Sequence, residues 1–440
     1  MKSLYLDTRF FLLLGGIALL FLLAYFFPVL FGVARITALA AAVLLLIDLF
    51  LIFRARKGFH VVREMAERLS NGDDNEIRIY LESLYNIPVG VTIIDELPFQ
   101  FQVRDQRYRL NLASGGRTIL SYRVRPVERG EYHFGAVNVF AVTPIALVRR
   151  RFRFDQDRTV AVYPSYIQLR RYELLAVTNR LTEAGIKRIR RIGNTMEFDQ
   201  IREYVRGDDY RTLNWKATAR RGEFMVNQYQ DERAQQIYSV IDKGRVMKMP
   251  FEGMTLLDYA INTSLVLSNI ALLKQDKAGI VTFAEKLGTV VPAERRRSQM
   301  QRILEVLYNQ KTNFLESNYE LLYAHVRQRI AGRSLLMLYT NFETLSSLHR
   351  QLPYLRKIAR DHLLVVVFFE NTELRSLLES PAASVEQVYV KTIAEKFAYE
   401  KRLIVKDLQR YGIHSILTPP SGLTVNTINK YLELKARRLI

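Results

Sequence analysis

The sequence of 440 residues contains no cysteine, which excludes disulfides, thiolate metal sites and a cysteine nucleophile. It also lacks the G-x-x-x-x-G-K-[ST] phosphate loop, the H-E-x-x-H zinc motif and the G-x-S-x-G nucleophile turn. The six histidines stand singly, without the spacing of metal ligands. We therefore expect a chain that is not an enzyme, hydrolyses no ATP, and needs neither a metal nor a cofactor.

Acidic residues are the scarcer charge, 44 against 64 Lys and Arg, which leaves a formal net charge of +20. Such an excess favours an acidic partner, whether anionic lipid, nucleic acid or an acidic protein surface, and charge alone does not choose among them. The chain is long for one hydrophobic core, so several domains are expected.

Two long apolar runs occupy the first sixty residues, at 10–27, ending before Pro28, and at 36–53. Each approaches the ~20 residues that a helix needs to cross a bilayer. A cleaved signal peptide is the competing interpretation, because Ala38-Leu39-Ala40 resembles a cleavage site, but more apolar sequence follows it directly. We expect residues 1–60 to form a membrane anchor of two transmembrane helices.

Basic residues flank this pair of runs on the outside, whereas only Arg35 lies in the connection; the flanking residues are Lys2, Arg9, Arg54, Arg56 and Lys57. By the positive-inside rule both termini and all soluble domains are expected on the cytoplasmic side of the inner, cytoplasmic membrane.

Asp48 lies within the second run. A carboxylate at that depth is a functional candidate, and the alternative is a side chain that reaches toward the lipid headgroups.

Residues 61–163 change to an alternation of apolar and polar side chains, as in Ile77, Ile79 and Leu81. Short strands separated by frequent turn residues predict a β-sandwich-like domain that acts as a spacer or interaction module. Near its end, Arg149, Arg150, Arg151 and Arg153 alternate with phenylalanines. We interpret this group as a strand with a solvated face or a lipid-facing patch, and a nucleic-acid surface is the less favoured alternative.

Residues 164–232 form a connector that begins with helical periodicity and continues into an unusually dense mixture of arginines, acids and aromatics. Its candidate residues for partner binding or for locking domains together are Arg202, Glu203, Tyr204, Arg206, Gly207, Asp208, Asp209, Arg211, Trp215 and Arg220. Arginine and carboxylate side chains form planar bidentate pairs, so a structural ion-pair cluster and a docking surface are both open interpretations. Catalysis is the weakest, because no residue pairs a nucleophile with a base.

Residues 233–440 alternate between apolar strands and amphipathic helices. We expect strands at 237–242, 278–285, 287–291, 334–340, 362–369 and 413–417, and helices at 256–272, 299–308 and 425–437. This order predicts an open, largely parallel sheet covered by helices, with 287–291 at an edge. The whole chain is thus expected to be an α+β multidomain protein.

The connector also carries a long motif. Residues 203–211 read Glu-Tyr-Val-Arg-Gly-Asp-Asp-Tyr-Arg and residues 214–220 read Asn-Trp-Lys-Ala-Thr-Ala-Arg. The chain thereby resembles domain-of-unknown-function family fifty-eight, whose members read REY-x-xGD-xxR and then W-x-ASAR. Residues 129–135, Arg-Gly-Glu-Tyr-His-Phe-Gly, are similar to a further hairpin motif of that family.

The resemblance implies a von Willebrand A-like (Rossmann-like) domain at 233–440 and association with a MoxR-type AAA+ ATPase and with other von Willebrand A proteins. Such a domain binds a metal through Asp-x-Ser-x-Ser and a later Asp. This chain has Asp242, Gly244 and Val246, and then Asn341, in those places. A hard cation that needs six or more oxygen ligands would find too few, so we expect a degenerate site without metal.

Together these features predict a membrane-anchored cytoplasmic adaptor or scaffold that acts with the ATPase through protein–protein interaction. The alternatives are a metal-dependent hydrolase that uses Asp208 and Asp209, and a basic protein that binds nucleic acid or lipid.

Overall fold

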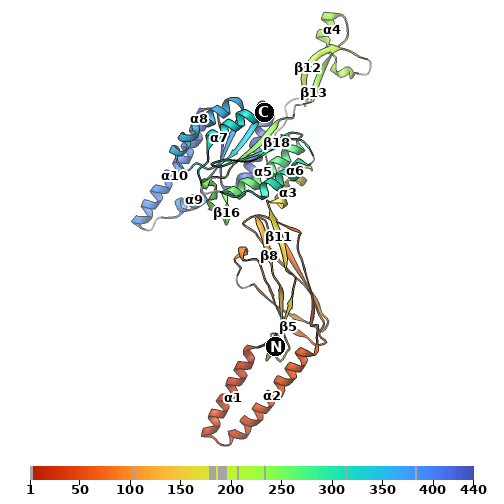
Figure 1. The fold of residues 1–440 in the computed structure, drawn as a ribbon, viewed down its shortest axis with the longest axis vertical. Helices are drawn as coiled ribbons and strands as arrows, with labels where there is room; N and C mark the ends of the chain where they lie inside the picture. The colour runs from red at the N-terminus through yellow and green to blue at the C-terminus, as the bar shows by residue number, and fades with distance from the viewer. Residues whose placement is uncertain are drawn as a thin grey trace. The chain divides into compact units, whose positions relative to one another are not determined.

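The computed structural model describes residues 3–103, 106–177, 185–186, 196–205, 208–231, 234–296, 298–312, 315–381 and 384–440. The chain divides into two compact units, Met1–Tyr163 and Pro164–Ile440. The first unit contains a helical hairpin and a β-rich domain, and the second contains a helix-covered sheet and a separate two-stranded hairpin (Figure 1). Each unit is considered by itself below.

The two apolar runs form helices α1 (Thr8–Phe26) and α2 (Leu30–Arg54), which pack against each other. The prediction of two apolar N-terminal helices is confirmed, although α2 begins six residues earlier than predicted, directly after the turn at Pro28. Both helices are long and apolar enough to cross a membrane, and most of their side chains are exposed, which suggests membrane anchoring. Helix α5 also meets the length and composition criterion, but it is buried in the second unit.

The β-rich domain contains three sheets that share one hydrophobic core. Their orders are β1-β10-β9-β5-β6, β2-β4-β7 and β3-β11-β8. The strands are β1 (Leu4–Leu6), β2 (Phe59–Glu64), β3 (Arg68–Ser70), β4 (Asn75–Ser83), β5 (Val89–Asp95), β6 (Arg107–Leu112), β7 (Arg117–Val124), β8 (Gly130–Phe134), β9 (Val137–Val142), β10 (Val148–Phe154) and β11 (Arg158–Tyr163). The predicted alternation is confirmed in β4, where Ile77, Ile79 and Leu81 are buried between the neighbours β2 and β7.

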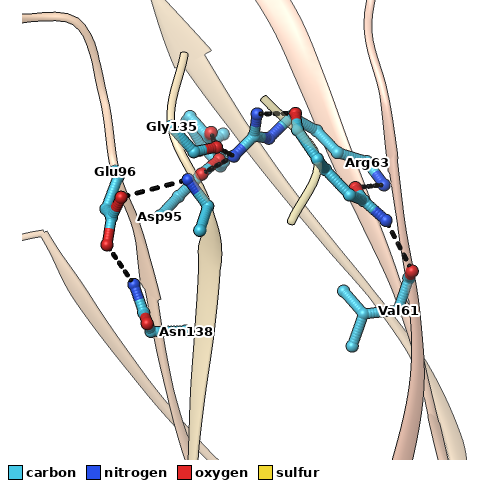
Figure 2. A network of polar contacts seen from close by, with 9 residues as sticks. Val61, Arg63, Asp95, Glu96, Gly135 and Asn138 are labelled. Atoms are coloured by element: carbon cyan, nitrogen blue, oxygen red, sulfur yellow. Dashed lines mark hydrogen bonds and ion pairs between the residues drawn. The ribbon is translucent and has the colours of Figure 1, made fainter. Parts of the chain in front are cut away.

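A buried ion pair lies inside the β-rich domain, between Arg63 of β2 and Asp95 of β5 (Figure 2). The Arg63 guanidinium also donates to the carbonyl of Gly135 at 2.8 Å, and Tyr122 donates its hydroxyl to Asp95. Burial raises the pKa of Asp95, while Arg63 and the Tyr122 hydroxyl act in the opposite direction. A buried charge without partners is very costly, so these contacts fix β2, β5, β7 and the turn at Gly135 relative to one another.

Asp48 of α2 is fully buried, and its hydrogen-bond donors belong to the β-rich domain. Its carboxylate accepts from the backbone N–H groups of Leu147 and Val148, both at 2.8 Å, and from the hydroxyl of Thr143. The alternative in which Asp48 reaches toward the headgroups is therefore wrong, because the segment from Thr143 to Val148, between β9 and the first residue of β10, supplies three donors.

The arginines of residues 149–153 belong to strand β10, as predicted, but protein groups engage them. Arg149 pairs with Asp7, the residue before α1. Arg150 donates to the carbonyls of Ile52 at 3.0 Å and Ala55 at 2.8 Å, which are carbonyls that the end of α2 leaves unpaired. Arg151 donates to Asn138 at 2.8 Å. A solvated face was expected for this strand. Instead, Arg149 and Arg150 connect the helical hairpin to the β-rich domain.

The second unit is built on a six-stranded sheet of order β18-β17-β14-β19-β20-β21. Its strands are β14 (Gln236–Asp242), β17 (Lys277–Phe283), β18 (Leu287–Glu294), β19 (Leu335–Tyr339), β20 (Leu363–Phe369) and β21 (His414–Thr418). All neighbours are parallel except β18, which pairs antiparallel with β17. Its place at the edge of the sheet is the one predicted. A small antiparallel pair, β15 (Pro250–Phe251) and β16 (Met254–Thr255), precedes α5.

Helices cover both faces of this sheet, so two separate cores form. One face packs against α3 (Tyr166–Val177), α5 (Leu256–Leu273), α6 (Gln299–Tyr308) and α11 (Leu423–Ala436). The other packs against α7 (Tyr319–Arg329), α8 (Leu345–Asp361) and α10 (Val385–Arg410), and α9 (Thr372–Glu379) contacts α10. The sequence analysis identified α5, α6 and α11 but did not identify α7 to α10. The sequence also has a basic segment after α3, at 187–191, which lies outside the described residues.

We expect Asp48→Ala to lower the free energy of unfolding of the first unit by at least about 2 kcal/mol, because each stranded buried donor costs about 1–3 kcal/mol. The measurement is the unfolding midpoint of the full chain in detergent. Asp48→Asn keeps an acceptor oxygen and should lose less. Equal unfolding midpoints for the parent and both variants would contradict a stabilising contact between Asp48 and the β-rich domain.

Candidate functional site

The motif residues of the connector lie on a two-stranded antiparallel hairpin, formed by β12 (Met196–Glu203) and β13 (Met225–Asp231). Between these strands the chain forms a short 3-10 helix, η3 (Tyr210–Thr212), and helix α4 (Trp215–Arg221). We call residues 202–205 and 208–225 the hairpin tip.

Side-chain capping explains the local structure of the hairpin tip. Asn214 begins α4, because its side chain accepts from the N–H of Ala217 at 3.0 Å. Gly222 ends the helix with a φ of +77°, a conformation that glycine adopts without strain. The Thr218 hydroxyl accepts from the N–H of Met225 at 3.0 Å, which returns the chain to β13. Met225 and Val226 are buried beneath this turn.

One bidentate ion pair stiffens the hairpin tip. Arg202 donates to both carboxylate oxygens of Asp208, at 2.9 and 2.7 Å, and the N–H of Val205 donates to the same group at 2.9 Å. The Arg202 hydrogen bonds, with that of Val205, lower the pKa of Asp208. Asp209 accepts from the N–H of Arg211 at 3.0 Å at the start of η3. Both partners of the ion pair belong to one hairpin, so it stabilises the hairpin itself.

The remaining predicted residues mostly face solvent. Trp215 is 68% exposed and Tyr210 is 70% exposed, with Tyr204, Val205 and Phe224 exposed nearby in the chain. Glu203 lies 3.9 Å from Arg221, and the Arg211 guanidinium lies over the Tyr210 ring, 5.8 Å from its centre. Arg220 is exposed in the last turn of α4, and Arg206 and Gly207 lie outside the described residues.

A second group of predicted residues lies at the carboxyl end of the central sheet, around the fully buried Asp242. One of its oxygens accepts from the N–H of Gly244 at 2.8 Å and from the Ser317 hydroxyl. The other accepts from the hydroxyls of Thr340 at 2.7 Å and Tyr319 at 3.2 Å. Burial raises the pKa of Asp242, and these hydrogen bonds partly offset that effect.

Gly244 has no room for a side chain. A Cβ atom there would lie 2.1 Å from the Ser317 hydroxyl oxygen and 3.1 Å from an oxygen of Asp242. Position 244 has a glycine where the motif has a serine. The Ser317 hydroxyl, from a loop distant in sequence, occupies that space and binds Asp242.

A cavity of about 410 Å³ opens beside this cluster. Its lining residues are Asp242, Arg245, Val246, Glu316, Ser317, Tyr319, Thr340, Asn341, Phe342, Glu343, Thr344, Ser347, Arg350 and Gln351. Glu316 pairs with Arg245 at 2.6 Å and lies 3.7 Å from Arg350, so charges of both signs already meet at the mouth.

Asn341 binds a lysine. The Lys401 ammonium, from α10, donates to the Asn341 side-chain oxygen at 2.9 Å and to the carbonyl of Phe369 at 2.6 Å. Burial lowers the pKa of Lys401 to about 8, against the opposing effects of Glu343 and Glu370. Lys401 therefore connects α10 to the ends of β19 and β20.

Sequence analysis identified Asp242 and Asn341, and the structure brings both to the lining of one cavity, with Val246. It missed Ser317, Tyr319, Thr340 and Lys401. Only Thr340 carried a usable signal, since it is the last residue of the predicted strand 334–340 and precedes Asn341. The other residues reach the site through tertiary packing.

Residues 200–375 match the family model described as "Protein of unknown function DUF58". A curated relative, the uncharacterized protein YeaD of Bacillus subtilis, is 30% identical over 126 residues, which are 28% of this chain. The match covers 31% of that relative's length. The family match contains the whole hairpin tip, and it contains Asp242 together with the four residues that donate to it.

Two solved structures are similar at low identity. The conserved hypothetical protein BatB of Bacteroides thetaiotaomicron is 11% identical with a TM-score of 0.32, covering 47% of this chain and 100% of that one. The CARDB domain of the PF1109 protein of Pyrococcus furiosus is 13% identical with a TM-score of 0.17, covering 24% of this chain and 94% of that one. These TM-scores are too low to support an argument about fold.

We expect Gly244→Ala to destabilise the second unit by about 1–3 kcal/mol through overpacking. Ser317→Ala, which removes the facing hydroxyl without adding atoms, serves as the control, and Gly244→Ala/Ser317→Gly should recover part of the loss. The readout is denaturant unfolding of each variant. A Gly244→Ala chain that unfolds like its parent would refute the close contact.

Lys401 should make stability depend on pH. Between its folded pKa of about 8 and its ordinary value of 10.5, the unfolded chain holds the proton that the folded chain has lost. Stability therefore rises with pH through this window, by up to about 3 kcal/mol, relative to a Lys401→Met variant. Unfolding at pH 7 to 10.5 measures the difference, and Lys406→Met, at an exposed lysine on the same helix, is the control. Parallel profiles for the parent and Lys401→Met would disprove the effect.

Proposed function

We propose that this chain is a membrane-anchored, non-enzymatic adaptor whose hairpin tip docks a protein partner. The observation that best supports this proposal is the exposure of Trp215 and Tyr210 on a structured hairpin whose helix is capped. Tryptophan, tyrosine and arginine are the residues that most often dominate binding energy at protein interfaces. The Arg202–Asp208 pair holds this surface in shape before binding, which reduces the entropy cost of association.

The von Willebrand A-like interpretation of the second unit is supported by its strand order. Numbered from β14 as the first strand, the order β18-β17-β14-β19-β20-β21 corresponds to 3-2-1-4-5-6, a doubly wound arrangement. Asp242 ends the first strand, where ligands gather in such sheets.

The Asp242 site does not fit a divalent cation. Each oxygen of Asp242 already accepts two hydrogen bonds, and Asn341 offers its oxygen to the Lys401 ammonium. A hard cation would have to displace these donors and would still lack ligands. We therefore propose an adaptor role for this domain without metal chemistry.

The partner is proposed from the family resemblance: a MoxR-type AAA+ ATPase, and other von Willebrand A proteins. Cationic side chains on α4, Lys216, Arg220 and Arg221, favour an acidic surface on that partner. The proposed location is the cytoplasmic face of the inner membrane, following the basic residues around α1 and α2.

The alternatives find less support. As a hydrolase, the chain would use Asp208 and Asp209, but these carboxylates bind Arg202 and the start of η3. As a nucleic-acid binder it would use the arginines of β10, but three of these bind the helical hairpin or neighbouring strands.

We expect Trp215→Ala to reduce recovery of a MoxR-type ATPase crosslinked to the chain in native membranes by at least about tenfold, the effect of losing an interface hot spot. Phe99→Ala is the matched control, because Phe99 is an 86% exposed aromatic of the β-rich domain. The unfolding midpoint should not change, since Trp215 is exposed. Undiminished recovery of the ATPase with Trp215→Ala would reject the hairpin tip as its docking surface.

A further inference from the structure

The N-terminal half of α10 exposes an unusual number of large apolar side chains. Val385 is 75% exposed, Tyr389 70% and Ile393 56%, and Val388, Val390, Phe397 and Tyr399 are also exposed. Between residues 385 and 400, all of which the structure describes, Ala394 alone is buried. The C-terminal half differs, because Ile404 and Leu408 are buried against the sheet.

This half of α10 is a well-formed helix that extends beyond the sheet (Figure 1). Ser384 caps its first turn by accepting from the N–H of Gln387 at 3.3 Å. On one side, Lys391 donates to the carbonyl of Leu378 at 3.3 Å and so holds α9. A contiguous exposed apolar face on a folded helix marks an interaction site.

The exposed face has a regular spacing. Val385, Tyr389, Ile393 and Phe397 follow one another at intervals of four residues, so they form one stripe along the helix. Glu386 and Lys396 lie on the same side of the helix, each five residues from position 391. In the described part of the chain, neither of these two charged residues takes part in an ion pair.

This pattern is complementary to itself. A two-fold axis perpendicular to the helix at the level of residue 391 exchanges position 386 with 396, 389 with 393, and 385 with 397. Two such helices in antiparallel orientation would place Glu386 opposite Lys396 twice, around a centre of tyrosine and isoleucine. Self-complementarity of this kind is what an isologous dimer interface requires.

We propose that the N-terminal half of α10 is a self-association surface, and that its occupant is the same helix of a second copy of this chain. A lipid surface fits less well, because interfacial helices carry an excess of Lys and Arg on their polar face. Here Glu386, Glu395 and Glu400 balance the lysines of the same stretch.

The absence of cysteine allows a direct test by crosslinking. Tyr389→Cys and Ile393→Cys variants of the full chain are co-expressed in one membrane and oxidised. We expect a disulfide-linked dimer, at least about tenfold more abundant than with Glu395→Cys, an exposed position on another side of α10. No dimer, or as much dimer with Glu395→Cys, overturns the proposal.

Charge reversal tests the proposed register. Glu386→Lys and Lys396→Glu should each weaken the dimer at least about tenfold, because each places like charges opposite one another. The double variant Glu386→Lys/Lys396→Glu should restore it, as measured by crosslinking and by light scattering in detergent. Both residues are exposed in the single chain, so each variant should still fold.

Failure of the double variant to recover overturns the antiparallel register. Stronger binding of Glu386→Lys to anionic phosphatidylglycerol vesicles, without any crosslinked dimer, would assign the surface to lipid instead. Neither result bears on docking at Trp215, because the two surfaces share no residue.

Discussion

A carboxylate removed from water must be given hydrogen-bond donors, and this requirement organises both units of the chain. Four buried aspartates show it. Asp48 joins the apolar helix α2 to β10, and Asp95 joins β-strands through Arg63. Asp242 gathers hydroxyls at the end of the central sheet, and Asp276 binds Lys435 and Tyr431 of α11, each at 2.6 Å. Each carboxylate connects elements that are distant in sequence, so its donors help to determine how those elements pack.

The same requirement explains why these acids do not suggest chemistry. A carboxylate that accepts four hydrogen bonds, as Asp242 does, has little capacity left for a cation or a substrate proton. Asp208 is occupied in the same way by Arg202 and Val205. The described residues also present exposed surfaces, which are the aromatic and basic side chains of the hairpin tip and the apolar stripe on α10. Surfaces of this kind are suited to binding proteins.

The helical hairpin is attached at both of its ends. Strand β1 precedes α1 and pairs with β10, while β10 also contacts the end of α2 through Arg150. The chain therefore enters and leaves the hairpin on the same side. This geometry agrees with two membrane crossings. Movement of α2 relative to the β-rich domain would have to break the hydrogen bonds of Asp48 and Arg150.

The sequence by itself determined the elements whose signal is local: the two apolar helices, the alternating β4, the strand β20 and the edge strand β18. It also indicated Asp242, Asn341 and the motif around Trp215, because residue types and spacing carry that information. Tertiary structure alone decided which groups surround them. Ser317 and Lys401 lie far along the chain from Asp242 and Asn341, and Thr143 and Leu147 lie far from Asp48. Such contacts depend on the packing of whole elements, which no local pattern records.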